Sequence, residues 1–408
     1  MNRNKKIGYL IIVLLLIVGV VWRIQDCFKL NIWSDERSSL YSSEGSLKET
    51  WKKSIHHERQ TPTYFLFLNL WRRIDPSIEF SRLLSVLFSI TSIFFVYKIW
   101  IYLFGSKWMW VAPLFYTFNS FHIWAASEAR VYALVILLCI ASSYYFIKIL
   151  INKHKQQKIS YYFLYFLLSI LGIYSFYPFA FLVLGHFIAA LIWLKGKKLG
   201  AILLCYILMG VSLLFWVPVL KYHFLYSISW GSAHEAKLDF IVSEPKSLQL
   251  LVSASVPFYQ FAKSVIYIPN PSIGAKIFIM MFFYGILGVL LCMRFLFDRK
   301  RPTIEEKVLM TTIITPFLFL SVLHFLNIGV STVRYYAIIS IAVLFMVVLI
   351  YNLENKIFKK FFVGLIIIVF FALSIWHDIR NPKNAPIADS CPRQVNLSSQ
   401  RWEHFKVV

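Results

Sequence analysis

Long apolar runs separated by short polar segments make up most of the chain. An α-helix needs roughly 17–25 mostly apolar residues to cross the hydrocarbon core of a bilayer, and most of these runs approach or reach that length. The pattern therefore predicts an α-helical, polytopic membrane bundle with about eleven transmembrane helices. The predicted spans are 7–21, 83–104, 108–124, 131–150, 160–176, 178–194, 199–220, 277–295, 308–328, 335–351 and 361–376.

Two further apolar segments are not predicted to cross the membrane. Residues 62–74 follow Thr61 and start at Pro62, which together favour a helix start. This segment is too short to cross and ends in two arginines, so we expect a helix that lies on the membrane surface. Residues 248–267 are interrupted by a proline, two glutamines and a lysine, and we expect an interfacial or re-entrant segment there.

The composition agrees with a membrane protein and argues against a nucleic-acid binder. Hydrophobic residues make up 59% of the 408 residues, charged residues only 15%, and the mean hydropathy is +0.66. Soluble domains carry about 25% charged residues. The net charge of +23 would suit nucleic acid, but the basic residues lie in short loops between apolar runs, as in polytopic membrane proteins.

The basic residues also predict the orientation of the chain. With the amino terminus in the cytoplasm, the inner segments hold 19 lysines and arginines and only four acids, which is the positive-inside pattern. These inner segments are 1–6, 105–107, 148–158, 195–198, 294–307 and 352–360. The orientation places a first loop (25–81), a second loop (221–276) and a tail (377–408) outside, all attached to one multi-span domain over 1–376.

Two further expectations concern the ends of the chain. No small-x-small cleavage site follows the first apolar run, so we expect it to be retained as a span rather than removed as a signal peptide. Cys27 and Cys391 would lie on the same outer side, and a disulfide between them is one of the possible arrangements.

The few charged residues outside the inner loops are predicted to gather on the outer side. The span interiors hold almost no ionisable groups; His186 lies within a span, and we interpret it as hydrogen-bonded packing. Ion-coupled transporters place acids or bases near the bilayer midplane, so their scarcity argues against transport. The outer residues form either a solvated rim or an active site. They are Asp35, Glu36, His57, Glu58 and Arg59 in the first loop, Glu128 and Arg130 in a tight turn, and Arg334 at the start of a late span.

Several short motifs around these residues follow one another in a fixed order. They are Asp35-Glu36 after the first span, a histidine–proline segment from His57 to Trp71, Ser81-Arg82-Leu83-Leu84-Ser85, residues 126–134 (Ala-Ser-Glu-Ala-Arg-Val-Tyr-Ala-Leu), and Arg334-Tyr335. In order and sidedness they resemble the polytopic C-type glycosyltransferases, more narrowly the protein O-mannosyltransferase and aminoarabinose–lipid A transferase group. The chain has one proline, Pro62, where that family usually has two, and a short tail, so the acceptor stays open.

The resemblance implies transfer of a sugar from a polyprenyl-phosphate-linked donor to an acceptor hydroxyl outside the cytoplasm, with inversion. The hydroxyl needs a general base and the leaving phosphate needs cations. The resemblance implies Asp35 as the base, with Glu36 as its rival because an extended loop would point neighbouring side chains in opposite directions. Glu128 would orient the acceptor or hold the first loop in place. Arg334 would bind the donor phosphate.

The remaining expectations concern weaker contacts, partners and cofactors. Arg130 would either pair with Glu128 or bind substrate, and segment 248–267 would cover the donor lipid. Because guanidinium groups bind phosphate bidentately, no cofactor is required, although a divalent metal stays open. Expected partners are the lipid-linked donor, a lipid, glycan or protein acceptor, and membrane lipids. The alternatives are a flippase or transporter of lipid-linked saccharides, and a sugar-lipid scaffold without catalysis. Further candidate substrate contacts are His57, Glu58, Arg59, Tyr132 and Tyr335.

Overall fold

The computed structural model describes residues 3–151, 158–231, 246–265, 273–297, 301–326 and 333–380. Within these ranges the chain is helical and contains no strand. The α-helices are α1 (Arg3–Lys29), α2 (Ser34–Ser42), α3 (Leu47–His56), α4 (Thr63–Arg72), α5 (Ile78–Phe104), α6 (Val111–Thr117), α7 (Ser120–Ala126), α8 (Tyr132–Ile151), α9 (Ile159–Ile173), α10 (Phe179–Trp193), α11 (Gly196–Leu214), α12 (Val217–Gly231), α13 (Lys246–Val265), α14 (Ile273–Cys292), α15 (Ile304–Phe325), α16 (Ala342–Asn352) and α17 (Lys356–Arg380). A π-helical segment, η1 (Met293–Phe297), follows α14, and a 3-10 helix, η2 (Val333–Ile339), precedes α16.

Six helical stretches in the described part of the chain are long and apolar enough to cross a membrane, which establishes a multi-pass membrane protein. They are Ile78–Phe104, Tyr132–Ile151, Gly196–Leu214, Phe278–Leu296, Ile304–Phe325 and Arg334–Asn352. The predicted helical membrane bundle is therefore confirmed, whereas the predicted count of about eleven spans is not. Cys391, which was considered as a disulfide partner of Cys27, lies outside the described residues, and so does most of the predicted tail.

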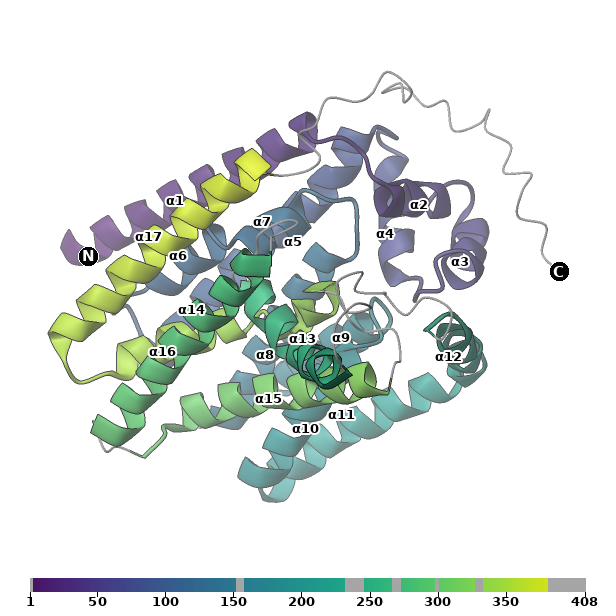
Figure 1. Cartoon of the computed structure of the whole chain (residues 1–408). Coiled ribbons are helices and arrows are strands. Elements are labelled where there is room, and N and C mark those ends of the chain that lie inside the picture. Colours follow the sequence, from purple (N-terminus) through teal and green to yellow (C-terminus); the bar gives the residue numbers. More distant parts are fainter. Residues whose placement is uncertain are drawn as a thin grey trace.

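Two of these stretches form the centre of the bundle. In the most apolar 18 residues of each stretch, the share of buried residues is 78% for Tyr132–Ile151 and 83% for Arg334–Asn352. The share is only 17% for Gly196–Leu214 and 22% for Phe278–Leu296. The central helix α8 packs against α5, α9, α10 and η2 (Figure 1). One central stretch begins just after the Glu128–Arg130 turn and the other begins at Arg334. The candidate residues at these points are thus attached to the best-packed part of the bundle.

The predicted span 108–124 is not one continuous helix, because the structure divides it into the short helices α6 and α7. Asn119 stands between them, and its side-chain oxygen accepts a hydrogen bond from the backbone N–H of His122 (3.1 Å), which caps α7. The buried Arg23 of α1 donates to the carbonyl oxygens of Thr117 (3.2 Å) and Tyr116 (3.5 Å) at the end of α6. A broken helix inside a membrane domain is tolerated when its freed backbone groups find such partners.

The first polar loop is folded into the three short helices α2, α3 and α4, which gather at one end of the molecule (Figure 1). The helix predicted after Thr61 is confirmed as α4. Its Asn69 donates to the carbonyl oxygens of Ser43 (2.8 Å) and Gly45 (2.9 Å), and its Arg72 donates to the carbonyl oxygen of Leu40 (2.6 Å). The polar side of α4 therefore holds the α2–α3 turn in place.

The segment 248–267 falls largely within α13, one continuous helix that includes Pro257. It packs against α14, α15 and η2. Whether this helix is interfacial or part of a re-entrant segment stays a prediction. The side-chain amide of Asn119 donates to the carbonyl oxygen of Val265 (3.0 Å), so the last turn of α13 is attached to the α6–α7 break.

Candidate active site

Asp35 and Glu36 lie in the first turn of helix α2, not in an extended loop. The expectation of an extended segment is wrong because Trp33 is the last extended residue (φ −118°, ψ 172°) and α2 starts at Ser34. Acidic side chains in a first turn are favoured by the helix dipole. Adjacent residues on a helix point about 100° apart, so the two carboxylates still face different partners.

The Glu36 carboxylate is fully buried and is held by three donors. Arg82 of α5 donates from Nε and Nη2, each at 2.9 Å, and the backbone N–H of Ala129 donates at 2.9 Å. Arg82 also donates to the carbonyl oxygens of Leu30 (2.7 Å) and Cys27 (3.1 Å) at the end of α1. This bidentate pair therefore joins α1, α2, α5 and the turn before α8, and it leaves Glu36 inaccessible to solvent in this structure.

Arg130 pairs with Glu58, which was not the partner named in the pairing alternative, and the other alternative, a contact with substrate, stays a prediction. The Nη1 of Arg130 contacts both carboxylate oxygens of Glu58 (3.1 and 3.2 Å) and donates to the hydroxyl of Ser39 (2.6 Å) and the carbonyl oxygen of Asp35 (3.0 Å). Burial opposes the charged form of Arg130, but nearby negative groups, Glu58 foremost, outweigh it and raise the pKa of the guanidinium. Arg130 thus fixes α2 against the end of α3.

The Asp35 carboxylate forms an ion pair with Arg334, a residue 299 positions later in the chain. Their side chains are 29% and 30% exposed. The pairs Glu36–Arg82 and Glu58–Arg130 are buried, so Asp35–Arg334 is the accessible pair among these three. The Arg334 guanidinium also lies over the ring of Trp33, 4.4 Å from its centroid. The structure therefore brings together two of the three outer segments that the sequence singled out.

Glu128 supplies the third segment. It is 1% exposed, and its carboxylate charge acts on the guanidinium groups of Arg82 and Arg334. Its own carbonyl oxygen accepts a short hydrogen bond from the hydroxyl of Ser85 (2.6 Å), which fixes the turn against α5. The carboxylates of Asp35, Glu36 and Glu128 therefore surround two arginines, one buried and one accessible.

Lys263 of α13 is a cationic neighbour of this group that was not predicted from the sequence as a site residue. Burial, together with the positive charges of Lys276 and Arg334, lowers the pKa of Lys263 to about 8. The charges of Lys276 on α14 and Arg334 on η2 thus both act on Lys263. The only signal in the sequence is a lysine inside an otherwise apolar stretch, which is more often a surface residue.

Two predicted substrate contacts are tyrosines packed between other aromatic rings. Tyr132 is 4% exposed and stacks on Trp124, with ring centroids 5.3 Å apart. Tyr335 stacks on Phe176, with ring centroids 5.5 Å apart. Each tyrosine follows a candidate arginine along the chain, so these stacks restrict where the arginines can move. A direct contact with substrate stays a prediction for both.

The other first-loop candidates lie at the end of α3. The ring of His57 is within hydrogen-bond distance of the Ser38 hydroxyl (3.1 Å) and packs edge-on against Tyr41. Burial lowers the pKa of His57; the charge of Glu58 opposes this shift and that of Arg59 adds to it. Arg59 has a left-handed backbone conformation (φ 52°), which is typical of a residue that ends a helix. Their roles as substrate contacts stay predictions.

A buried histidine on α12 attaches the other side of α3. His223 Nε2 donates to the carbonyl oxygen of Ile55 (2.8 Å), and the Tyr177 hydroxyl donates to His223 Nδ1 (2.6 Å). The indole of Trp216 in turn donates to the Tyr177 hydroxyl (3.0 Å). These donor and acceptor roles are all satisfied when the imidazole is neutral.

Acid is expected to loosen this junction. Burial, supported by the charge of His56, lowers the pKa of His223 below 6.5. The unfolded chain then binds a proton at higher pH than the folded protein, so the stabilisation by His223 is present above about pH 6.5 and is lost as the pH falls below it. The melting temperature should fall on acidification, and less steeply in His223→Gln. An unchanged slope in His223→Gln would refute this assignment.

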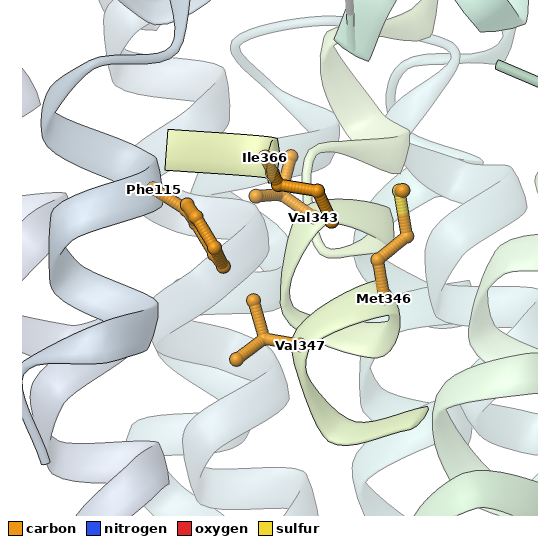
Figure 2. Close-up of a pocket in the computed structure, with 5 residues that line it drawn as sticks. All are labelled: Phe115, Val343, Met346, Val347 and Ile366. Atoms are coloured by element: carbon orange, nitrogen blue, oxygen red, sulfur yellow. The ribbon is translucent and has the colours of Figure 1, made fainter. Parts of the chain in front are cut away.

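Two further features of the described residues concern metal ligands and cavities. Among the residues that the structure describes, no group of three or more His, Cys, Asp or Glu side chains could hold a metal ion. An apolar recess between α6, α16 and α17 is lined by Phe115, Val343, Met346, Val347 and Ile366 (Figure 2). It offers no group that could transfer a proton or bind phosphate, so the candidate site is the charged cluster and not this recess.

Comparison with known proteins shows the fold. No protein-family model and no curated protein matches the chain. Among solved structures, ArnT from Cupriavidus metallidurans, in the apo state and bound to undecaprenyl phosphate, is 12% identical with a TM-score of 0.52; the match covers 86% of this chain and 62% of ArnT. The oligosaccharyltransferase of Archaeoglobus fulgidus, tethered with an acceptor peptide containing the NVT sequon, is 12% identical with a TM-score of 0.52, covering 91% of this chain and 55% of that protein.

A further structure of the Archaeoglobus fulgidus enzyme, in complex with Zn and sulfate, is 13% identical with a TM-score of 0.52. The chain spans between half and two thirds of the length of these proteins. The expected resemblance to the polytopic C-type glycosyltransferases is confirmed at the level of the fold.

Proposed function

We propose that this chain, which has the fold of the polytopic C-type glycosyltransferases, is an integral-membrane glycosyltransferase. It moves a sugar from a polyprenyl-phosphate-linked donor to an acceptor hydroxyl on the extracytoplasmic face, with inversion. The observation that carries the proposal is the accessible pair of Asp35 and Arg334. A carboxylate and a phosphate-binding guanidinium meet there from two distant parts of the chain, which are the two groups that this reaction needs.

The proposed reaction is a displacement at the anomeric carbon. The acceptor oxygen forms a bond to that carbon while the bond from the carbon to the phosphate oxygen breaks. The acceptor proton passes to the Asp35 carboxylate, and polyprenyl phosphate leaves with the electron pair. The leaving group gains negative charge, which the guanidinium of Arg334 is placed to stabilise. Attack from the side opposite the phosphate inverts the anomeric centre.

Asp35 is a better candidate base than Glu36 on grounds of access. Glu36 is 0% exposed, and its oxygens accept from Arg82 and the Ala129 backbone, so no acceptor hydroxyl can reach it without breaking that pair. Asp35 is 29% exposed. We assign Glu36 to positioning α2, so that the neighbouring Asp35 points toward Arg334.

Arg130 and Glu128 have supporting roles in the same proposal. Because Arg130 holds the Asp35 backbone and the Glu58 carboxylate, we assign it to positioning rather than to phosphate binding. Glu128 keeps negative charge beside Arg82 and Arg334 and either orients the acceptor or holds the first loop. The undecaprenyl phosphate in the similar ArnT structure supports a lipid-linked donor for this fold.

The proposal is tested with purified protein in lipid vesicles and labelled polyprenyl-phosphate sugars. Wild type should form a new glycosidic bond with at least one acceptor hydroxyl from a panel of lipid, glycan and peptide acceptors. Glu128→Gln should insert normally and lose most of this transfer. Runs with and without chelator determine whether a divalent metal takes part. Movement of intact donor across the vesicle membrane, without any new bond for any acceptor, would contradict the proposal and support a flippase.

A further inference from the structure

The ion pair between Asp35 and Arg334 joins the group proposed as the base to the group proposed as the phosphate ligand. Its two side chains are 29% and 30% exposed, and both come from segments fixed by buried contacts. Asp35 sits beside the buried Glu36, and the aromatic stack of Tyr335 follows Arg334. While the pair is formed, the carboxylate has fewer lone pairs for an acceptor hydroxyl, and the guanidinium has fewer N–H groups for a phosphate.

Arg334 lies among charges of both signs. The positive charges of Arg130 and Lys263 and the negative charges of Asp35 and Glu128 interact with it, and Lys276 acts on Lys263. Like charges at close range repel one another unless an anion lies among them. The Asp35 carboxylate is the anion that contacts Arg334 directly. Its negative charge thus offsets the positive charge of Arg334, as the charge of a bound phosphate group would.

The Trp33 ring favours one position of the guanidinium. Arg334 lies 4.4 Å from the Trp33 ring centroid, within the distance of a cation–π contact. Trp33 directly precedes α2, so Arg334 is held by two groups from the same short segment. Exchanging Asp35 for another anion does not require Arg334 to leave the Trp33 ring.

We propose that Asp35 occupies the phosphate position on Arg334 in the empty enzyme, and that the donor phosphate displaces it. This inference rests on the proposed function and adds a binding order to it. The carboxylate becomes available to the acceptor only after the donor has bound, so the donor binds first. A site without donor then has its base engaged.

Direct binding measurements test this exchange. Undecaprenyl phosphate in detergent micelles is titrated into wild type, Asp35→Asn and Asp35→Ala. Competition by the native ion pair lowers the apparent affinity in proportion to the fraction of sites in which the pair is open. Removing a pair worth about 0–1 kcal/mol should therefore tighten binding roughly 2- to 6-fold in both variants. Affinity that is unchanged or weaker in folded Asp35 variants would overturn the proposal.

Two matched controls separate displacement from a general charge effect. Glu79→Gln removes one negative charge from the first turn of α5 and should bind like wild type. Glu128→Gln removes a carboxylate whose charge acts on Arg334, and it should gain clearly less affinity than Asp35→Asn. An equal gain in Glu128→Gln and Asp35→Asn would mean a through-space effect and would overturn the displacement.

A third variant distinguishes failure of this inference from failure of the proposed function. Arg334→Gln should weaken binding of undecaprenyl phosphate at least 10-fold, and inorganic phosphate should compete in wild type only at far higher concentration than the lipid. Loss of binding in Arg334→Gln with no gain in Asp35→Asn would overturn the exchange alone. Wild-type affinity in Arg334→Gln would overturn both, because the phosphate site would then lie elsewhere.

Discussion

Replacing Asp35 with asparagine is expected to reduce sugar transfer by roughly 10²- to 10⁴-fold, the usual contribution of a general base. Asparagine has nearly the same shape as aspartate but cannot take up the acceptor proton. The protein should remain folded, because an ion pair as exposed as Asp35–Arg334 contributes only about 0–1 kcal/mol to stability. The measurement is the initial rate of glycoside formation by purified Asp35→Asn in vesicles, compared with wild type at equal amounts of inserted protein.

The matched control for this prediction is Glu79→Gln, which makes the same change of charge in the first turn of α5 at a residue that is not part of the Asp35–Arg334 pair and should keep the wild-type rate. The combination of lost transfer and tighter phosphate binding in Asp35→Asn is hard to obtain from misfolding, which would lower both. Transfer at the wild-type rate by Asp35→Asn would exclude Asp35 as the base.

Arg82→Met is expected to destabilise the folded protein far more than Asp35→Asn does. It leaves the Glu36 carboxylate buried without its ion-pair partner, with the Ala129 backbone N–H as the remaining donor named above, and removes the donor to the carbonyl oxygens of Cys27 and Leu30. Breaking a buried ion pair by removing one partner costs about 3–5 kcal/mol, a large part of a typical folding free energy. We expect a clear fall in melting temperature and a smaller monodisperse fraction in detergent.

A double-mutant cycle and a control sharpen this second prediction. Glu36→Gln combined with Arg82→Met should cost less than the sum of the two single changes, because the buried charge is removed together with its partner. Arg73→Met replaces an exposed arginine at the end of α4 and should leave the melting temperature unchanged. Wild-type stability in Arg82→Met would show that the pair does not hold α2 in place.

The sequence predicted the parts of the fold that depend on membrane burial alone. Residues 83–104, 131–150 and 308–328 were expected as spans and correspond to α5, α8 and α15. It did not predict the break between α6 and α7. That break has neither glycine nor proline at its centre, and it is stabilised by Arg23 and Val265, which lie far away in the sequence. Hydropathy registers apolar length and carries no information about such partners.

The sequence predicted which residues belong to the candidate site, but it did not predict which of them form ion pairs with each other. The sequence singled out Asp35 and Arg334, which meet in the structure. It left open whether Arg130 pairs with Glu128 or binds substrate, and the structure gives Arg130 an ion pair with Glu58 at the end of α3. Which acid a buried arginine contacts depends on how the short helices α2 and α3 fold back on each other, and periodicity does not specify that.

The central claim is that this protein breaks the bond between a sugar and a polyprenyl phosphate and makes a glycoside. The most direct measurement follows both products in one reaction of the purified wild-type protein with doubly labelled donor and an acceptor that it uses. We predict one polyprenyl phosphate released for each glycosidic bond formed, with the opposite anomeric configuration to the donor. Donor that crosses the membrane intact, with no polyprenyl phosphate released, would contradict this claim.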